Sequence, residues 1–185
     1  MGRIMTGRSA RFDAALARVF GHEGGFSDRP LSADPGGATM MGITRATLAR
    51  WRGRPVTKDE VRALTASEAA DIYFENYWKP VRGDDIDPGL AYTLFDFRIN
   101  TSPRGVAKAV QRAIGARVDG IMGPQTWGLL LDTPPDLAIR RIAVERLAHM
   151  RRLPNWWANR NGWPRRVHEV QEHSLDLTRG ARCPA

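Results

Sequence analysis

The spacing of apolar residues divides the chain into amphipathic helices that are interrupted once by a turn-rich stretch. Apolar residues recur at helical spacing between residues 11 and 22, which predicts a helix that ends at or just before Glu23. The predicted apolar face consists of Phe12, Ala15, Leu16, Val19 and Phe20. Residues 26–43 lose this period and contain two prolines and several glycines, which predicts turns and a small β-hairpin.

Beyond residue 44 the pattern is almost entirely helical. Thr44, Thr57 and Thr65 stand where helices begin, and the last two are followed three residues later by Glu, as in a capping box. Further helices are expected over about residues 88–99, 102–115, 124–131, 135–152 and 164–177. The pattern therefore predicts a mainly α fold, a helical bundle with a small β-hairpin next to the first helix.

An interruption near residues 85–88 indicates a boundary between two lobes. Gly83, two acidic residues and a proline break the helical pattern there. We expect a flexible N-terminal tail (residues 1–9), a first lobe (10–87), a helical lobe (88–178) and a flexible C-terminal tail (179–185). The chain of 185 residues is long enough to bury a core without disulfides or metals.

The charge of the chain predicts an anionic partner. The formal net charge is +8, and the segment from residue 137 to 185 holds ten Arg against four acidic residues. Nucleic acid, anionic lipid headgroups and acidic cell-wall polymers would all suit such a surface. No helix-turn-helix, zinc finger or RNA-binding signature appears, so nucleic acid is the least supported of the three and is not an expected partner.

The remaining composition excludes several classes of protein. The lone Cys183 permits no internal disulfide, and the absence of a cluster of Cys and His at ligand spacing predicts neither a metal nor another cofactor. No apolar run resembles a signal-peptide core or a bilayer span, so we expect synthesis in the cytoplasm and no stable membrane insertion. We expect a monomer.

Two carboxylates in different settings form a candidate hydrolytic site. Cleavage of a glycosidic bond requires one carboxylic acid to protonate the leaving oxygen and a second group to direct water or to attack. Glu23 follows an apolar helix, a partly desolvated setting that raises a carboxyl pKa, whereas Asp34 lies in a glycine-rich turn open to solvent. A tight turn would bring the hydroxyl of Thr39 beside Asp34 to hold water. The alternative for Glu23 is a carboxylate that merely follows a helix, and the alternative for Asp34 is a residue that merely forms a turn.

Several spaced motifs resemble one known family. Near the N-terminus they are Glu23-Gly24-Gly25-Phe26, then Asp34-Pro35-Gly36-Gly37-Ala38-Thr39, then Gly42-Ile43-Thr44. Later come Ile72-Tyr73 with Tyr77-Trp78, Leu94-Phe95-Asp96 with Asn100, and Gly162-Trp163 followed by Arg165 or Arg166. Together, over about residues 16–168, they are similar to the glycoside hydrolase family of N-acetylmuramidases found in phage endolysins and in muramidases that assist toxin secretion.

The resemblance implies a lysozyme-like α+β fold and assigns roles to the site residues. Glu23 becomes the general acid, and the similar spacing in phage-type lysozymes makes Asp34 the base and Thr39 the water-positioning group, with Thr44 in place of a glycine. The expected sugar-binding residues are Gly24, Gly25, Phe26, Gly36, Gly37, Tyr77, Trp78, Asp96 and Asn100. Phe26 departs from the Tyr that is usual in the family. Asp96 is either a second acid in the cleft or a residue of the helix face that joins the lobes.

The second half of the chain contains a further resemblance and a tryptophan cluster. Residues 110–115 and 118–127 resemble a peptidoglycan-binding repeat, with a helix, an Asp-Gly turn and a Gly-Pro helix start; alternatively they simply form the helical lobe. Among the clustered tryptophans we expect Trp156 and Trp163 in the core and Trp157 on the solvent side, where it would stack on a sugar ring.

These observations predict an enzyme of the cell wall. We expect a lysozyme that cleaves the β-1,4 bond between N-acetylmuramic acid and N-acetylglucosamine in peptidoglycan glycan strands. It would act in the periplasm or wall during endolysin-like lysis, after release through a holin or a similar route. The alternative is a non-catalytic module that binds the wall or assists secretion. The stereochemical outcome is left open.

Overall fold

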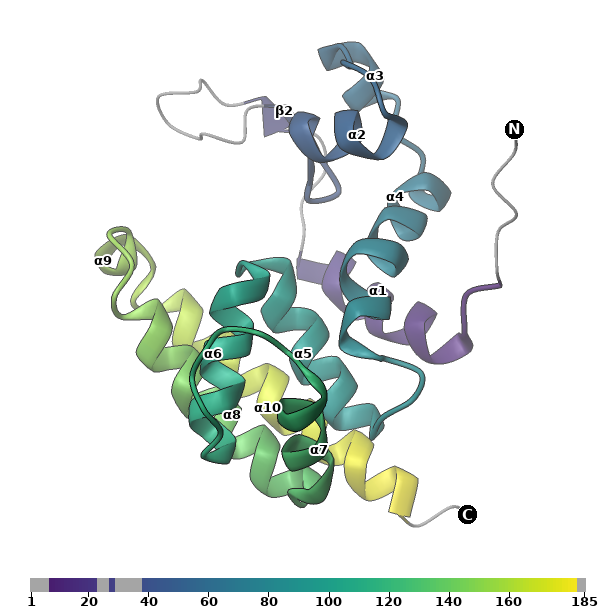
Figure 1. Cartoon of the computed structure of the whole chain (residues 1–185). Helices are drawn as coiled ribbons and strands as arrows, with labels where there is room; N and C mark the ends of the chain where they lie inside the picture. Colours follow the sequence, from purple (N-terminus) through teal and green to yellow (C-terminus); the bar gives the residue numbers. More distant parts are fainter. Residues whose placement is uncertain (1–6, 23–26, 29–37, 183–185) are drawn as a thin grey trace. The chain divides into compact units, whose positions relative to one another are not determined.

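The computed structural model describes residues 7–22, 27–28 and 38–182, and the chain packs as two units, Met1–Tyr77 and Trp78–Ala185 (Figure 1). The division falls within a π-helical turn, η1 (Phe74–Trp78), earlier than the interruption near residues 85–88. The reason is that Trp78 belongs to the second unit: its ring meets the ring of Phe95 edge-on, with centroids 5.3 Å apart.

Helix α1 (Ala10–His22) opens the first unit and confirms the first predicted helix. Phe12, Ala15, Leu16 and Val19 are buried along one face, as the spacing predicted. The Phe12 ring meets the ring of Phe74 edge-on, with centroids 5.0 Å apart. The apolar face of α1 therefore holds the helix within the core of the first unit.

Polar contacts fix the chain just before α1. The Ser9 hydroxyl accepts a hydrogen bond from the Phe12 N–H at 3.1 Å and so acts as an N-cap. The Arg8 guanidinium donates to the Asp71 carboxylate at 2.6 Å and to the Ser67 carbonyl at 3.2 Å. The described end of the segment expected to be a flexible N-terminal tail, residues 7–9, is thus tied to the rest of the unit.

The predicted hairpin is confirmed as part of a three-stranded antiparallel sheet. Strands β1 (Ser27–Asp28), β2 (Ala38–Met40) and β3 (Ile43–Thr44) lie in the order β1-β2-β3. Met41 and Gly42 join β2 to β3 with φ of 48° and 74°. Positive φ at both central residues is characteristic of the type I′ turn, whose twist suits a two-residue hairpin.

Three short helices complete the first unit, and each begins at a predicted threonine. They are α2 (Arg45–Arg52), α3 (Lys58–Arg62) and α4 (Ala66–Tyr73). Each threonine hydroxyl accepts a hydrogen bond from the backbone N–H three residues on. The capping box at Thr57 is complete, because the Thr57 N–H also donates to the Glu60 carboxylate at 2.9 Å.

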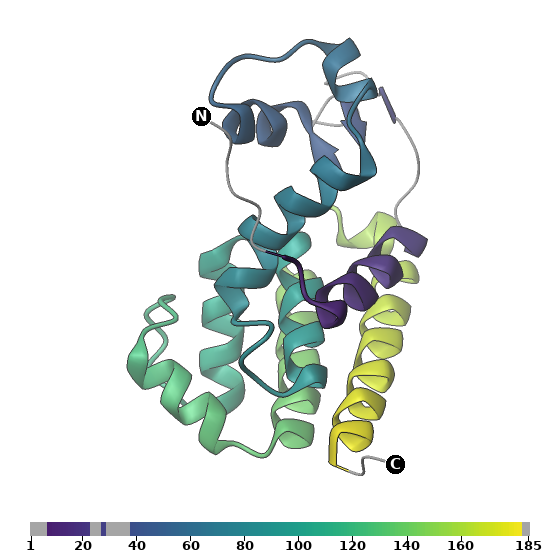
Figure 2. The ribbon, with the colours of Figure 1, turned by 90° about the vertical axis from the view of Figure 1, so that its right-hand side faces the viewer.

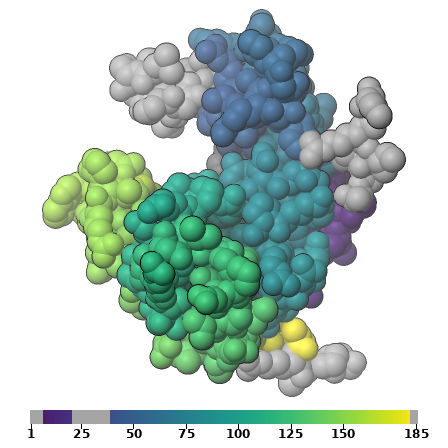
Figure 3. Space-filling model, viewed as in Figure 1, coloured from purple at the N-terminus to yellow at the C-terminus, as the bar shows by residue number. Residues whose placement is uncertain are grey.

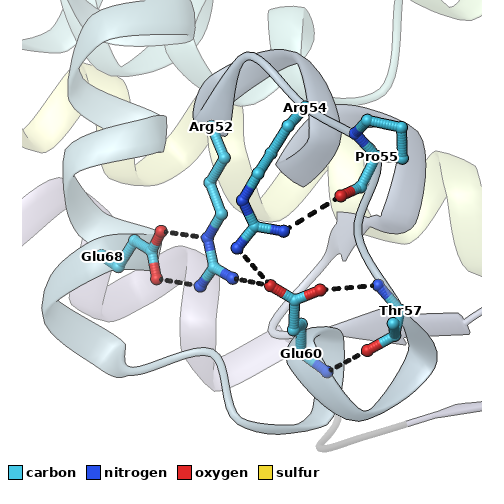
Figure 4. Close-up of polar contacts among 6 residues, drawn as sticks. All are labelled: Arg52, Arg54, Pro55, Thr57, Glu60 and Glu68. Atoms are coloured by element: carbon cyan, nitrogen blue, oxygen red, sulfur yellow. Dashed lines mark hydrogen bonds and ion pairs between the residues drawn. The ribbon is translucent and has the colours of Figure 1, made fainter.

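The expected capping box at Thr65 is only half formed, because Glu68 binds a different partner (Figure 4). The Arg52 guanidinium donates to both Glu68 oxygens, at 2.9 and 2.8 Å, and to Glu60 at 3.2 Å. Arg54 also donates to Glu60, and this hydrogen bond, followed by that from the backbone of Thr57, lowers the pKa of Glu60 to about 2. Two arginines from the end of α2 and the loop after it therefore join α2, α3 and α4.

The second unit is a helical bundle (Figures 1 and 2). After the short 3-10 helix η2 (Lys79–Val81) come α5 (Pro88–Ile99), α6 (Pro103–Ile114), α7 (Pro124–Asp132), α8 (Pro135–Met150), α9 (Trp156–Asn159) and α10 (Gly162–Arg182). Helices α5, α8 and α10 pack against one another, and α6 packs on α8. Across the described residues, none of the helices combines the length and apolarity that crossing a bilayer requires.

The predicted helices and the mainly α, lysozyme-like fold class are confirmed, with one extension. Helix α10 begins at Gly162 and continues through Arg182. Residues 179–182, expected to belong to a flexible tail, are therefore helical. Leu175 and Thr178 are buried, so the last turns of α10 are still anchored by the bundle.

Helix α5 is the centre of the second unit and is buried on all sides from Gly89 to Phe97. Gly89 permits a close approach of α10, because a Cβ at this position would lie 2.0 Å from the carbonyl oxygen of Ser174. On the same seam the Thr178 hydroxyl donates to the Asp87 carboxylate at 2.7 Å, and the Thr93 hydroxyl donates to Ser174 at 2.8 Å. A small residue and two hydrogen bonds from threonine hydroxyls thus join α10 to α5 and to its N-cap residue.

One buried charge cluster joins all three central helices. Asp96 of α5 is fully buried and lies 2.7 Å from Arg146 of α8 and 2.8 Å from Arg166 of α10. Burial alone would raise the pKa of Asp96, but the charges of the two arginines outweigh it and lower that pKa. The contribution of this carboxylate to stability is present above its unfolded pKa and is lost as pH falls through its lower folded pKa.

We expect Gly89→Ala to destabilise the second unit by about 1–3 kcal/mol, because the added methyl group must push α10 away from α5. Gly128→Ala in α7 is the matched control. A Cβ there meets nothing within 4 Å, and this change should stabilise the helix by about 0.5–1 kcal/mol. Urea denaturation of both variants measures the difference. Equal effects of the two changes would contradict the close approach at Gly89.

We expect Asp96→Asn to destabilise the protein by about 3–5 kcal/mol, because Arg146 then keeps a buried positive charge without its counter-charge. Asp176→Asn, which alters an exposed pair with Arg179 on α10, should change stability little. Thermal and urea denaturation provide the measurement. A loss at Asp96 no larger than the loss at Asp176 would refute the importance of the cluster.

Candidate active site

The predicted general acid follows directly after the last residue of α1. The last residue of α1 is His22, and Glu23 is the next residue in the sequence. The Glu23 side chain itself lies outside the described residues, together with the expected base and the nearby sugar-binding residues. These are Gly24, Gly25, Phe26, Asp34, Gly36 and Gly37. The structure describes the elements that flank these residues in the sequence, which are α1, β1 and β2.

Thr39, the expected water-positioning residue, lies in the middle of the central strand β2. It pairs with Ser27 of β1 on one side and with Thr44 of β3 on the other, and its side chain is half-buried. Helix α3 packs against the same strand. Strand β2 is therefore held by both neighbouring strands and by α3.

The turn that follows Thr39 explains the Gly-Ile-Thr motif in structural terms. Gly42 supplies a left-handed conformation, Ile43 is 1% exposed, and the Thr44 hydroxyl caps α2 by accepting from Thr47 N–H at 3.2 Å. The motif thus builds a turn, a core contact and a helix start in succession. Its residues shape the hairpin that carries Thr39.

A tyrosine from α4 fastens this turn. The Tyr73 phenol donates a hydrogen bond to the backbone carbonyl of Met41 at 3.1 Å. The Tyr73 ring lies between two others, with centroids 5.6 Å from Phe20 and 5.4 Å from Tyr77. The aromatic cluster of Phe20, Tyr73 and Tyr77 therefore links the last turns of α1 to the hairpin.

The two aromatic residues predicted to bind sugar differ in exposure. Tyr77 is half-buried within η1, and its sugar contact stays a prediction. Trp78 is 1% exposed, and a Cβ on Gly83 would lie 2.1 Å from its indole ring. Its indole is enclosed by the core of the second unit, so the expectation that Trp78 stacks on substrate is wrong.

The expectation that Asp96 contacts substrate is also wrong. Its carboxylate is 0% exposed and is neutralised by Arg146 and Arg166. The structure also distinguishes the two arginines of the Gly-Trp-Arg motif. Arg166 reaches Asp96, whereas the side chain of Arg165 is 80% exposed and lies near Glu169. The motif residues around Asp96 and Arg166 are thus a structural pair that holds the bundle together.

The remaining predicted sugar-binding residues are exposed. Asn100 ends α5 as its C-cap, and its contact with substrate stays a prediction. Trp157 is 73% exposed, as expected, with the Arg160 guanidinium 5.9 Å from its ring centroid. Trp157 lies on α9, in a segment that stands out from the body of the second unit in Figure 3. Its stacking on sugar also remains a prediction.

The other two clustered tryptophans pack as predicted. The rings of Trp156 and Trp163 lie 6.2 Å apart between centroids. Both pack against a buried cluster of Ala143, Met150 and Val167. They therefore anchor the α9 segment to α8 and α10.

The sequence analysis missed two residues, one that organises the second unit and one that fastens the turn after Thr39 in the first. Arg146 lies on the buried face of α8, at helical spacing from Ile142, Ala143 and Met150. An arginine within that apolar row, together with a lone carboxylate on the apolar helix α5, was a readable signal of a buried pair. Tyr73 gave no such signal, because a hydrogen bond from its hydroxyl to a distant turn leaves no pattern in the sequence.

The loop that resembles a peptidoglycan-binding repeat is organised by one amide. Gln111 of α6 donates to the Asp119 carboxylate at 2.7 Å and to the Ile121 carbonyl at 3.0 Å. Its amide oxygen accepts from the Gly120 N–H at 2.8 Å. The hydrogen bond from Gln111 and then that from the backbone of Ile121 lower the pKa of Asp119. Within the described part of the chain, no three His, Cys, Asp or Glu side chains gather as a metal site would require.

Comparison with known proteins agrees with this frame. A family model described as glycosyl hydrolase 108 matches residues 16–101, which contain the second half of α1, the sheet and α2–α5. The solved structure of SagA from Brucella abortus is 40% identical in sequence, with a TM-score of 0.84. That match covers 93% of this chain and 98% of the SagA chain. No curated protein matches significantly. The chain therefore belongs to glycosyl hydrolase family 108, a membership that makes it a glycosidase and supports peptidoglycan as its substrate.

Proposed function

We propose that this glycosidase is an N-acetylmuramidase with Glu23 as its general acid. It hydrolyses the β-1,4 bond between N-acetylmuramic acid and N-acetylglucosamine in peptidoglycan, in an endolysin-like lysis of the bacterial wall. The observation that carries the proposal is the position of Glu23, directly after a helix whose apolar face is buried, inside the segment that matches a glycosyl hydrolase family. Membership in that family supports the hydrolytic chemistry.

The position after α1 suits an acid that must carry a proton at neutral pH. The C-terminal end of a helix bears a partial negative charge, which disfavours a carboxylate placed beside it and raises its pKa. Partial burial of the carboxyl among apolar residues would act in the same direction by desolvation. Glu23 would then deliver its proton to the glycosidic oxygen as the bond to the anomeric carbon breaks.

Asp34 and Thr39 would direct the water that attacks. In this proposal Thr39 orients a water molecule, Asp34 removes a proton from it, and the resulting nucleophile adds to the anomeric carbon from the face opposite the leaving group. The products are two shorter glycan fragments, with inversion at the anomeric carbon. The ordered position of Thr39 between β1 and β3 supports this role, since water must be oriented by a group that does not itself move.

We expect Glu23→Gln to lower the release of muropeptides from purified sacculi by about 10²–10⁴-fold, because the amide cannot donate the acid proton. Glu172→Gln, an exposed change on α10, serves as the matched control and should keep wild-type activity. Mass spectrometry of the wild-type products should find N-acetylmuramic acid at the reducing ends. Reducing-end N-acetylglucosamine would refute the bond assignment. Full activity of Glu23→Gln would refute the assignment of Glu23 as the general acid. Binding to sacculi with no released fragments from wild type would favour a non-catalytic wall-binding module.

We expect Thr39→Val to lower kcat by on the order of 10²-fold with little change in KM, because the methyl group keeps the shape of the side chain but cannot hold water. Thr39→Ser, which keeps the hydroxyl, should retain most of the activity. Thr133→Val, which removes a half-buried hydroxyl that donates to the Leu129 carbonyl in the second unit, is the control. Steady-state kinetics on soluble glycan fragments separates kcat from KM. Equal losses in the Val and Ser variants would contradict a role for the hydroxyl.

A further inference from the structure

The second unit contains a small apolar pocket that none of the proposed catalytic steps uses. It has a volume of about 200 Å³ and lies among η2, α5, α6, α7 and the loop over residues 115–123. Its apolar wall includes Val81, Leu94, Val106, Ala107, Met122 and Trp127. Val81, Leu94, Val106 and Ala107 are buried, so the base of the pocket is part of the rigid bundle.

The loop that borders the pocket is preorganised. Gln111 holds this loop by hydrogen bonds to Asp119, Gly120, Ile121 and Thr126. The Asp119 carboxylate is engaged by Gln111 and by the Ile121 N–H at 2.8 Å. The Asp119 carboxylate is therefore used in hydrogen bonds within the loop.

Cations lie beside the same pocket, and Arg98 is one of its lining residues. The stems of Arg104 and Lys108 cover Gly120, because a Cβ on Gly120 would lie 2.8 Å from Arg104 and 3.3 Å from Lys108. On another side the Arg82 guanidinium lies 5.4 Å from the ring centroid of Trp127. Gly120 and Trp127 both line the pocket, so its mouth is flanked by positive charge. Asp85, at 3.9 Å from Arg82, offsets only one of these cations.

We propose that this pocket binds the acidic stem peptide of peptidoglycan, and the inference rests on the proposed function for the identity of the substrate. The stem peptide carries alanine methyl groups and free carboxylates on a short chain. A methyl-bearing residue suits the apolar wall, and a carboxylate suits the flanking cations. The volume lies below the 300–1,000 Å³ that is usual for a drug-sized ligand.

The pocket would then bind a second part of the same polymer, the peptide that is attached to the glycan strand. The first unit acts on the glycan strand, and the pocket of the second unit takes the peptide attached to that strand. The two contacts are separable in an experiment, because isolated stem peptide contains no glycosidic bond and a glycan stripped of peptide contains no ligand for the pocket. Peptide binding can therefore be measured whether or not the chain cleaves glycan.

The test titrates the full chain with synthetic stem tetrapeptide, followed by amide chemical shifts and by calorimetry. We expect saturable shifts at Ala107, Gly120 and Trp127. Removing both rim cations in Arg104→Ala/Lys108→Ala should weaken binding about three- to tenfold. Filling the mouth with Met122→Trp should weaken it by about tenfold or more. A peptide with amidated carboxylates should bind as weakly to wild type as the acidic peptide binds to the double variant.

Arg140→Ala/Arg141→Ala is the matched control, since it removes two exposed positive charges from the same unit at α8. It should bind the peptide as wild type does. An equal loss in this control would show a general charge effect and overturn the proposal. So would the absence of saturable binding to wild type, even if sacculi are cleaved. Peptide binding without any glycan cleavage would leave the pocket assigned and refute the proposed muramidase instead. Circular dichroism of every variant verifies that the fold is kept.

Discussion

A single carboxylate with two guanidinium partners, buried where α5, α8 and α10 meet, is the constraint on which the second unit depends. Asp96 lies within 3 Å of both Arg146 and Arg166, and no apolar residue could take its place without leaving those charges uncompensated. The pairing also fixes which faces of the three helices meet, because each charged atom must find its partner. Helix α5 is buried on all sides from Gly89 to Phe97 and has no solvent-facing stripe to set its rotation, so the carboxylate, with the Thr93 hydroxyl, supplies that information.

The first unit is organised by backbone capping and by aromatic contacts, with no comparable buried charge among its described residues. Its helices are short, and a lone helix of this length is marginal in water. The three threonine caps and the shared arginine of Figure 4 therefore contribute much of the local order around β2. This order matters for the proposed chemistry, because the strand that carries Thr39 rests on it. The two units thus use different physical means to reach a defined structure.

Much of the fold could be predicted from the sequence because its signals are local. Helical periodicity and proline at the first turn placed α5 at the residues where it is found, and the threonines marked three helix starts. The roles of Trp78 and Asp96 could not be read in this way, since a motif names a residue type but not its burial. Apolar residues precede and follow Asp96 in the sequence, and its burial follows from this setting and not from the motif. The sequence placed Glu23 after a helix and Asp34 in a glycine-rich turn, but it could not predict the distance between their carboxylates.

The turn at Met41 and Gly42 makes the stability of the hairpin depend on the aromatic cluster of the first unit. Methionine in a left-handed conformation costs about 1–2 kcal/mol, and Asn or Gly would be the favoured residue there. An isolated hairpin with this dipeptide is therefore poorly populated. In the folded unit, the hydrogen bond from the Tyr73 phenol to the Met41 carbonyl stabilises this turn. The stability of the hairpin is therefore coupled to the docking of α4, and loss of the Tyr73 contact would weaken the strand pairing.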